Sequence, residues 1–301
     1  MAGVLVPACD DASMMSTSMD HADAGSDSNA GAAGGFVSGM APANGTELYF
    51  EEQGVGETVV LLHGLTLDAR IWDDQFAALA KEYHVVRFDQ RGHGRSGGVT
   101  ESFSQPDDLA GLLEYLQVSE AHLVGLSMGG FVSYQFALEH PAMVKSLVLV
   151  DSAREFVGDD EFETRLTQYV TRALGGDLEG GLRDWFDDPL FAPARTKQEV
   201  EAQLETIIVK GQLALGENAF FAQVLKVDTF TPPAEERLAE INAPTLVLIG
   251  ELDLPPFQKH ADLLAARIPG ATKQEIEGSG HMSSMEQPAA VTSAILEFLR
   301  N

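Results

Sequence analysis

The segment "HLVGLSMGGFVSYQFALEH", residues 122–140, sets a lone serine, Ser127, between an apolar run and a helix-like pattern. Glycines surround this serine at Gly125, Gly129 and Gly130. Glycine has no Cβ, so it permits positive φ angles and lets other backbone come close. The pattern therefore predicts a tight turn from a strand into a helix, with the serine hydroxyl exposed at the turn.

Other short apolar runs along the chain predict the remaining strands. They are rich in Val, Leu and Ile without alternation, which is typical of parallel strands buried on both faces. Helix-like patterns separate them, so we expect an α/β fold with a mostly parallel sheet and flanking helices. The predicted strands are residues 59–64, 84–89, 122–127, 146–151, 245–250 and, more weakly, 272–278. The predicted helices are 69–81, 107–116, 128–139, 257–268 and 288–300. The turn at 44–46 predicts a hairpin before them.

The connection over residues 152–244 is much longer than a crossover between strands requires. It is rich in helix-compatible patterns broken by Gly and Pro. We predict that it forms a helical cap, inserted before the last two strands of a core made of residues 35–151 and 245–301. Residues 1–34 contain no aromatic residue and no periodic pattern. Such a segment cannot bury enough apolar area to offset its ordering entropy, so a flexible leader is predicted there.

The leader contains the only cysteine of the chain, Cys9, directly after a short apolar stretch. This arrangement resembles the end of a bacterial lipoprotein signal, but no basic region precedes it and Pro7 is unusual at its position. By default, we interpret residues 1–34 as a tail without function and the protein as cytoplasmic. The alternative is a bacterial lipoprotein with a lipid anchor at Cys9. No apolar run reaches the roughly 18 residues of a membrane-spanning helix, so no transmembrane segment is predicted.

The charge balance excludes some partners. The chain has 46 acidic and 19 basic residues and a net charge of −27, which repels nucleic acid and anionic membrane surfaces. A single cysteine permits no intramolecular disulfide and no cysteine-based metal site. No cluster of His and Asp has metal-ligand spacing, and no glycine loop has the pattern of a phosphate cradle. The sequence therefore predicts no metal, no organic cofactor and no nucleic-acid partner.

The serine turn has the G-x-S-x-G pattern of a nucleophile elbow, and a nucleophilic serine needs a base that is oriented by an acid. Among eight histidines, His281 lies in a Gly/Ser loop after the last predicted strand, where its ring can reach back over the sheet edge. We place His260, in contrast, on a helix surface. Asp253 follows the penultimate strand and Asp151 ends the strand before the predicted cap. Both are candidate acids, and the position after the penultimate strand favours Asp253.

An acyl-transfer site also needs backbone N–H groups that stabilise an oxyanion. One comes from the residue after the nucleophile, Met128, and the other from the loop after the strand at 59–64. Leu65 is the candidate in that loop, with His63 and Gly64 shaping the turn. Backbone donors have no side-chain signature, so both assignments depend on loop position.

The motifs "LLHGLTLDARIW", "DQRGHGRS", "LVGLSMGG", "LVLIGELDLPP" and "GSGHMSSMEQP" together resemble the α/β-hydrolase fold family, in its capped branch, over residues 35–301. The resemblance implies that Ser127 is the nucleophile, His281 the general base, Asp253 the orienting acid, Leu65 and Met128 the oxyanion donors, and His93 a structural residue. Members that open epoxides or carbon–halogen bonds carry an aspartate nucleophile, so Ser127 argues against both reactions. Perhydrolases often carry proline beside the oxyanion position, where this chain has Leu65.

The predicted function is that of a serine hydrolase that cleaves a carboxylic ester of an apolar small molecule through an acyl-enzyme. A C–C bond hydrolase, an enol-lactonase and an acyltransferase are alternatives on the same triad. A non-catalytic binding protein would tolerate loss of a triad member, and none is missing. A C–C hydrolase would need cap cations to hold a dienoate; the available arginines are Arg154, Arg165, Arg172, Arg183 and Arg195. The aromatic residues predicted to roof an apolar pocket are Trp185, Phe186, Phe191, Phe220 and Phe221.

Overall fold

The computed structural model describes residues 34–99, 101–154, 161–216, 219 and 231–301. The predicted leader lies outside the described residues except for Gly34, and so do Cys9, Phe220 and Phe221. Within the described ranges, no helix is long and apolar enough to cross a bilayer.

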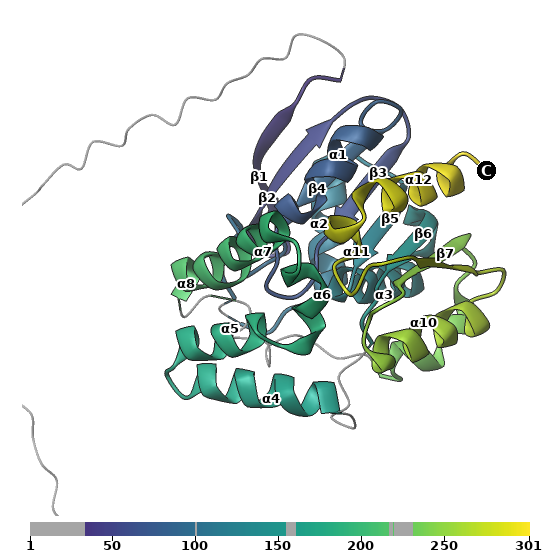
Figure 1. Ribbon diagram of the computed structural model, residues 1–301. Coiled ribbons are helices and arrows are strands. Elements are labelled where there is room, and N and C mark those ends of the chain that lie inside the picture. Colours follow the sequence, from purple (N-terminus) through teal and green to yellow (C-terminus); the bar gives the residue numbers. More distant parts are fainter. Residues whose placement is uncertain (1–33, 100, 155–160, 217–218, 220–230) are drawn as a thin grey trace, which may run out of the picture. The chain divides into compact units, whose positions relative to one another are not determined.

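The core is an eight-stranded sheet with the order β1-β2-β4-β3-β5-β6-β7-β8 (Figure 1). Its strands are β1 (Val37–Ala43), β2 (Thr46–Gln53), β3 (Thr58–Leu62), β4 (His84–Phe88), β5 (Ala121–Leu126), β6 (Val144–Val150), β7 (Thr245–Gly250) and β8 (Thr272–Ile276). From β4 to β8 all neighbouring strands run parallel, whereas β2 is antiparallel to both β1 and β4. The predicted mostly parallel sheet is therefore confirmed.

The burial of the strands explains which of them have strong sequence signals. Every residue of β5 and of β7 is buried, which accounts for their continuous apolar runs. In β8, at the edge of the sheet, the first four residues are exposed, so its pattern is polar and weak. The hairpin between β1 and β2 turns at Asn44 and Gly45, whose φ angles of 44° and 74° suit a tight two-residue turn.

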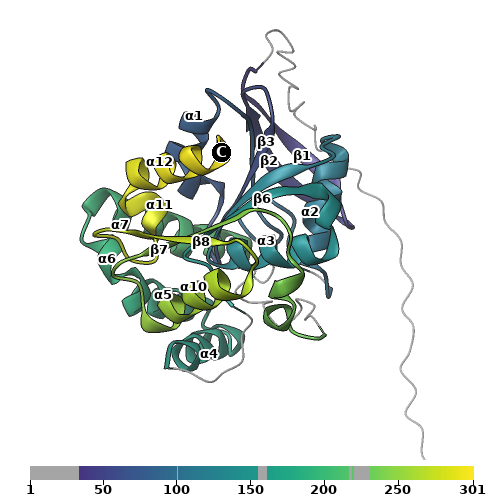
Figure 2. The ribbon, with the colours of Figure 1, turned by 90° about the vertical axis from the view of Figure 1, so that its right-hand side faces the viewer.

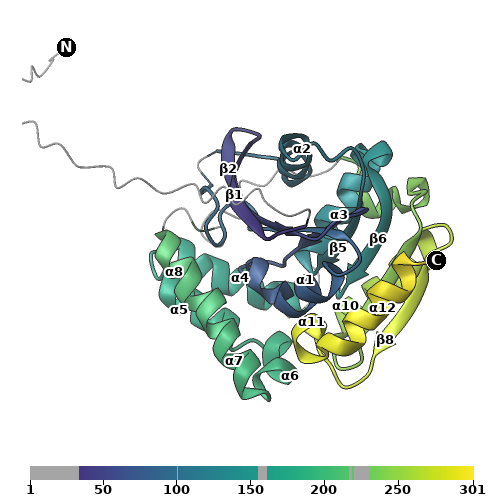
Figure 3. The same cartoon turned by 90° about the horizontal axis from the view of Figure 1, so that it is seen from above.

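Helices cover both faces of this sheet. They are α1 (Asp73–Leu79), α2 (Gln105–Tyr115), α3 (Met128–Glu139), α10 (Pro255–Arg267), α11 (Ser283–Glu286) and α12 (Pro288–Leu299). Helix α1 packs beside α12 and α2 beside α3. Figures 2 and 3 show α1 and α12 on one side of the sheet and α2 on the other. The observed helices agree with the five predicted ones to within a few residues at their ends.

The connection between β6 and β7 contains further helices, grouped at one end of the sheet (Figure 1). These are α4 (Glu161–Leu174), α5 (Leu178–Phe186), α6 (Ala192–Arg195), α7 (Gln198–Glu205) and α8 (Gln212–Leu215), with a π-helical turn at Thr206–Gly211. They contact the loops that follow the carboxyl ends of the strands. A Cβ built on Gly280, after β8, would lie 2.6 Å from Cγ of Pro193 in α6.

One side chain differs from its predicted placement. His260 was expected on a helix surface, but only 3% of it is exposed. It shares the buried face of α10 with Phe257, Ala261 and Leu264, an i, i+3, i+4, i+7 pattern that faces the core. Burial lowers the pKa of His260 to about 4, so the ring is neutral near pH 7. The predicted exposure of His260 was wrong because this polar residue occupies a core-facing position of the helix, where an apolar residue is the usual choice.

Candidate active site

Ser127 stands at a strained turn between β5 and α3. Its φ of 54° and ψ of −118° are uncommon for a residue with a Cβ. Hydrogen bonds hold the backbone in this conformation: its N–H donates to the carbonyl of Val150 at 2.9 Å, and its carbonyl accepts from the N–H groups of Phe131 at 3.1 Å and Ala153 at 3.0 Å. The turn directs the hydroxyl away from the strand, as expected for a nucleophile elbow.

The glycines around Ser127 are required by close packing. A Cβ on Gly125 would lie 2.2 Å from the carbonyl oxygen of Gly129, and one on Gly129 would lie 2.3 Å from that of Leu62. A Cβ on Gly130 would lie 2.6 Å from Oγ of Ser152. Any larger side chain would push α3 away from the strands, and the turn would change with it.

The structure brings together the three side chains predicted to act on the substrate. Nε2 of His281 lies 2.9 Å from Oγ of Ser127, and Nδ1 of His281 lies 2.8 Å from Oδ2 of Asp253. His281 and Asp253 are both buried. A proton on Nδ1 that is donated to the carboxylate leaves Nε2 as an acceptor for the serine hydroxyl. This is the geometry that proton abstraction from the serine needs.

Asp151, the other candidate acid, makes different contacts. Its Oδ1 accepts from the Gly250 N–H at 2.8 Å, and its Oδ2 accepts from the N–H and the hydroxyl of Ser283 at 3.2 and 2.5 Å. These bonds join the end of β6 to the loops after β7 and β8. Burial, and then the Asp253 carboxylate, raise the pKa of Asp151 well above its usual range. Asp151 thus supports the loop of His281 without bonding its ring.

Glu286 is a further supporting residue, and the sequence did not reveal it. Its Oε2 accepts from the N–H of Gly280 at 2.9 Å and its Oε1 from the N–H of Met282 at 3.0 Å. The buried carboxylate therefore binds the backbone on both sides of His281. The available signal was an acidic residue in the short helix directly after the histidine loop, but the bonds are to backbone groups and leave no motif.

The backbone of both candidate oxyanion donors lies beside Ser127. Met128 is the first residue of α3, where an N–H has no acceptor within the helix. A Cβ on Gly64 would lie 3.1 Å from Cβ of Ser127, so the peptide between Gly64 and Leu65 is next to the serine. Within the described part of the chain, the Leu65 N–H makes no hydrogen bond. We call residues 64–67 the oxyanion loop.

Two buried histidines hold this loop from the core side. Nδ1 of His63 donates to the carbonyl of Gly64 at 2.8 Å, while its Nε2 accepts from the Gln90 N–H at 2.9 Å. Nε2 of His93 accepts from the Thr66 N–H at 3.1 Å. Burial lowers the pKa of His63 to about 4 and that of His93 well below its usual value. Both rings are therefore neutral near pH 7, which suits the structural role expected for His93.

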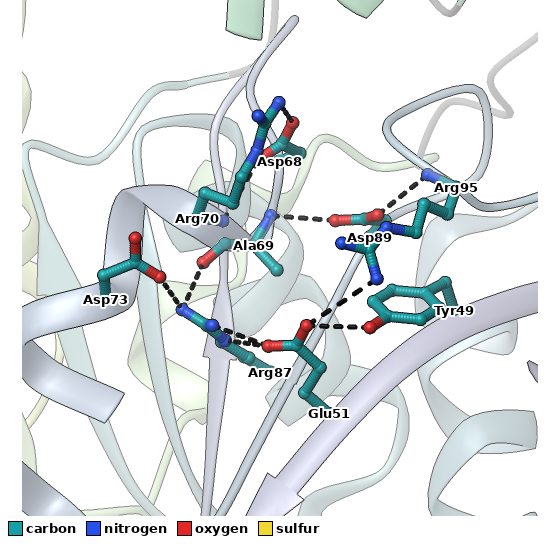
Figure 4. A network of polar contacts seen from close by, with 9 residues as sticks. All are labelled: Tyr49, Glu51, Asp68, Ala69, Arg70, Asp73, Arg87, Asp89 and Arg95. Carbon is teal, nitrogen blue, oxygen red and sulfur yellow. Dashed lines mark hydrogen bonds and ion pairs between the residues drawn. The ribbon is translucent and has the colours of Figure 1, made fainter. Parts of the chain in front are cut away.

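A polar network joins the chain after β3 to the chain after β4 (Figure 4). Oδ1 of Asp89 accepts from the Ala69 N–H and its Oδ2 from the Arg95 N–H, both at 2.8 Å. Arg87 pairs with Glu51 at 2.6 Å and also donates to the Ala69 carbonyl at 3.2 Å. Burial, and then the charge of a neighbouring carboxylate, raise the pKa of Asp89 to about 6. The network anchors the chain just beyond the oxyanion loop.

A group of potential metal ligands occurs elsewhere. In the described ranges, ligand atoms of Asp107, Glu139 and His140 lie within 4.8 Å of one another. The two carboxylates are exposed. Glu139 is the last residue of α3, so the group lies at the opposite end of that helix from Ser127. It is therefore separate from the site around Ser127.

Comparisons with known proteins agree with this fold. The profile of the "Alpha/beta hydrolase family" matches residues 59–294. The 2-hydroxy-6-oxononadienedioate/2-hydroxy-6-oxononatrienedioate hydrolase of Burkholderia vietnamiensis is 31% identical over 85% of this chain and 93% of its own. The 3-oxoadipate enol-lactonase 1 of Acinetobacter baylyi is 26% identical over 81% of this chain and 88% of its own. The solved thermophilic esterase of Thermogutta terrifontis is 28% identical with a TM-score of 0.75, over 88% of this chain and 98% of its own. The chain therefore belongs to the alpha/beta hydrolase family and is a hydrolase enzyme.

Proposed function

We propose that this enzyme is a serine hydrolase that cleaves carboxylic esters through an acyl-enzyme. Ser127 is the nucleophile, His281 the general base and Asp253 the acid that orients it. The observation that supports the proposal best is the unbroken series of hydrogen bonds from Asp253 through His281 to Ser127, at 2.8 and 2.9 Å. The esterase among the structural neighbours is consistent with it.

The reaction follows from the direction of these bonds. Oγ of Ser127 attacks the ester carbonyl carbon while Nε2 of His281 takes the hydroxyl proton. The negative charge that develops on the carbonyl oxygen accepts hydrogen bonds from the N–H groups of Leu65 and Met128. The C–O bond to the alcohol then breaks, and His281 gives its proton to the departing oxygen. A water molecule, activated by the same ring, hydrolyses the acyl-enzyme and restores Ser127.

We further propose that helices α4–α8 act as the cap of this site and that the acyl group is apolar. A row of aromatic rings supports this: Phe257 lies 4.2 Å from the ring of His281, Phe162 lies 5.0 Å from Phe257, and Trp185 lies 6.1 Å from Phe162, measured between centroids. The row leads from the general base into α4 and α5. Aromatic surface of this kind favours apolar groups over hydrated ones.

The pairing of the arginines supports an uncharged acyl group. All five arginines that could hold a substrate carboxylate bind groups of the protein itself. Arg154 pairs with Glu163, Arg165 with Asp188, Arg172 with Asp177 and Asp184, and Arg183 with Glu179, while Arg195 donates to the carbonyls of Phe186, Asp187 and Asp188. None of these five arginines therefore offers an unpaired guanidinium to a carboxylate on the acyl chain, and burying a charge without a partner is strongly unfavourable.

Two esters of equal chain length test the substrate class. We expect kcat/KM for p-nitrophenyl butyrate to exceed that for p-nitrophenyl hemisuccinate by at least about 100-fold, roughly 2.7 kcal/mol of barrier. Ser127→Ala supplies the background rate for each ester. An equal or reversed preference would contradict the uncharged acyl group and favour the dienoate and enol-lactone hydrolases among the relatives, so a dienoate and an enol-lactone belong in the same panel.

The pH profile tests the role of His281. Burial lowers the pKa of this ring. The Asp253 carboxylate, and after it Asp151, raise the pKa by more than burial lowers it, so the net shift is upward from 6.5. Below its pKa the ring is protonated and cannot accept the proton of Ser127. We expect kcat/KM on a neutral ester to rise with pH, with a midpoint above 6.5. Asp253→Asn should move that midpoint to lower pH, and an unmoved midpoint would mean that another group is the base.

A further inference from the structure

We propose that Trp185 is a positioning residue that holds the oxyanion loop, so that helix α5 takes part in stabilising the transition state. Nε1–H of Trp185 donates to Oγ1 of Thr66 at 2.8 Å. Thr66 directly follows Leu65, whose N–H is a proposed oxyanion donor. The inference rests on the proposed function, because that function is what gives the Leu65 N–H its task.

The hydroxyl of Thr66 connects the tryptophan to the backbone of the loop. It accepts from Trp185 and donates to the carbonyl of Leu65 at 2.6 Å. The next N–H, that of Thr66, donates to His93 at 3.1 Å. Both polar groups of the peptide between Leu65 and Thr66 are thus held in place. Thr66 needs this support because its φ of 61° is uncommon for a β-branched residue.

The loop is therefore held from two sides. His63 and His93 bind it from the core, through the Gly64 carbonyl and the Thr66 N–H. Trp185 binds it from the α5 side. Thr66 is fully buried and only 3% of Trp185 is exposed, so water does not compete for the bond. Its loss would leave a buried indole N–H without this acceptor and let the hydroxyl of Thr66 turn away from Leu65.

The effect on the reaction should appear in kcat. Trp185 does not bond the reacting atoms, and the Leu65 N–H is needed most when charge develops on the carbonyl oxygen. Removing one oxyanion donor outright lowers kcat by about 10²–10³. Displacing a donor has a smaller effect, and we expect a loss of about 10-fold to 100-fold. Binding of the uncharged ester, and hence KM, should change by less than about threefold.

The test compares Trp185→Phe, Thr66→Val and the double variant on p-nitrophenyl butyrate. Each single variant removes one partner of the hydrogen bond. Thr66→Val preserves the shape of its side chain, whereas Trp185→Phe also leaves a smaller ring. We expect kcat to fall by about 10-fold to 100-fold in each, and the double variant to be no slower than the slower single one, because both act through one bond. Butylboronic acid, whose adduct with Ser127 bears an oxygen in the oxyanion position, should lose affinity by a similar factor.

Two further variants separate this role from packing. Trp72→Phe is the matched control, since Trp72 is fully buried but its Nε1 has no hydrogen-bond partner among the described residues. Its kcat should stay within about twofold of the wild-type value, whatever its melting temperature. Thr66→Ser keeps the hydroxyl and should regain most of the kcat that Thr66→Val loses. A ¹⁵N NMR spectrum should show the indole N–H signal of Trp185 shifting in Thr66→Val, independently of activity.

The outcomes are distinct. An active wild-type enzyme whose Trp185→Phe and Thr66→Val variants keep kcat within threefold overturns the inference alone. So does a double variant whose loss equals the product of the two single losses. A wild-type protein that neither cleaves the ester nor binds the boronic acid overturns the proposed function and this inference together. If Trp185→Phe does not fold, Thr66→Val, which is isosteric, decides the question.

Discussion

Replacing Ser127 with Ala is expected to lower kcat for ester hydrolysis by on the order of 10⁵–10⁶, since the equivalent change in a well-studied serine protease costs about 2 × 10⁶. The methyl group cannot attack the carbonyl carbon, and His281 then has no proton to take. The fold should survive, because the turn is held by backbone bonds to Val150, Phe131 and Ala153 that do not involve the hydroxyl. Steady-state kinetics and labelling with a fluorophosphonate probe measure the effect.

The labelling experiment locates the nucleophile directly. The wild-type enzyme should take up one probe molecule per chain, on the peptide that contains Ser127, and Ser127→Ala should take up none. Ser133→Ala is a suitable control, because Ser133 is a buried serine of α3, the helix that begins directly after Ser127, and its hydroxyl only donates to the carbonyl of Gly129 at 2.7 Å. It should label at the normal rate. Persistent labelling of Ser127→Ala would show that another residue is the nucleophile.

Asp253→Asn is expected to lower kcat by about 10³–10⁴, as the same change does in a serine protease. The substitution keeps the shape of the side chain but removes the charge that stabilises the imidazolium of His281 in the transition state. Because Oδ1 of Asp253 accepts from the Leu254 N–H at 2.7 Å, the amide oxygen of Asn is expected to keep that bond and the amide NH₂ to face Nδ1, so the other tautomer of His281 becomes favoured. That tautomer has no lone pair directed at Ser127. The measurement is kcat on p-nitrophenyl butyrate, with circular dichroism to verify folding.

Asp151→Asn is the matched comparison. Asp151 is buried, like Asp253, and lies at the same edge of the sheet. Its oxygens accept hydrogen bonds from Gly250 and Ser283, however, and not from the ring of His281. Because burial already disfavours its charge, an amide there should reduce kcat by less than about tenfold, or roughly 1.4 kcal/mol. The reverse order of effects would assign the acid to Asp151. Two mild effects would mean that neither carboxylate orients His281.

The parts of the fold that could be predicted from sequence are those with local signals. The strand at 245–250 and the helix at 128–139 were predicted with their observed ends, because full burial leaves a continuous apolar run and the helix stops before Pro141. The insertion of β4 between β2 and β3 was not predicted. Strand order depends on contacts between distant segments, which a single sequence does not report. The burial of His260 was missed for a related reason, since only the packing of α10 shows which face is covered.

The residues of the candidate site also fall into those that the sequence could predict and those that it could not. Ser127, Asp253 and His281 could be proposed because the chemistry requires those residue types at the carboxyl ends of strands. The residues that hold them, such as Glu286 and Thr66, act through backbone N–H and carbonyl groups. Backbone groups are present at every position, so a contact with them leaves no pattern to detect. Trp185 illustrates the difference. Its apolar ring led to a predicted place in the pocket roof, but the hydrogen bond from its indole N–H to Thr66 could be identified only in the structure.

The separation of Ser127 and His281, along the chain and across the sheet, has a consequence for the synthesis of the enzyme. Ser127 and His281 are 154 residues apart in the chain and follow β5 and β8, which are separated by β6 and β7. At a spacing of about 4.8 Å between strands, the histidine loop must reach back over roughly 14 Å of sheet. The contacts from Asp151 and Glu286 that hold this loop also require the C-terminal residues. Because such distant contacts form late, we expect a nascent chain to complete the turn of Ser127 well before His281 can reach it, and the proposed hydrolysis to begin only when β8 has joined the sheet.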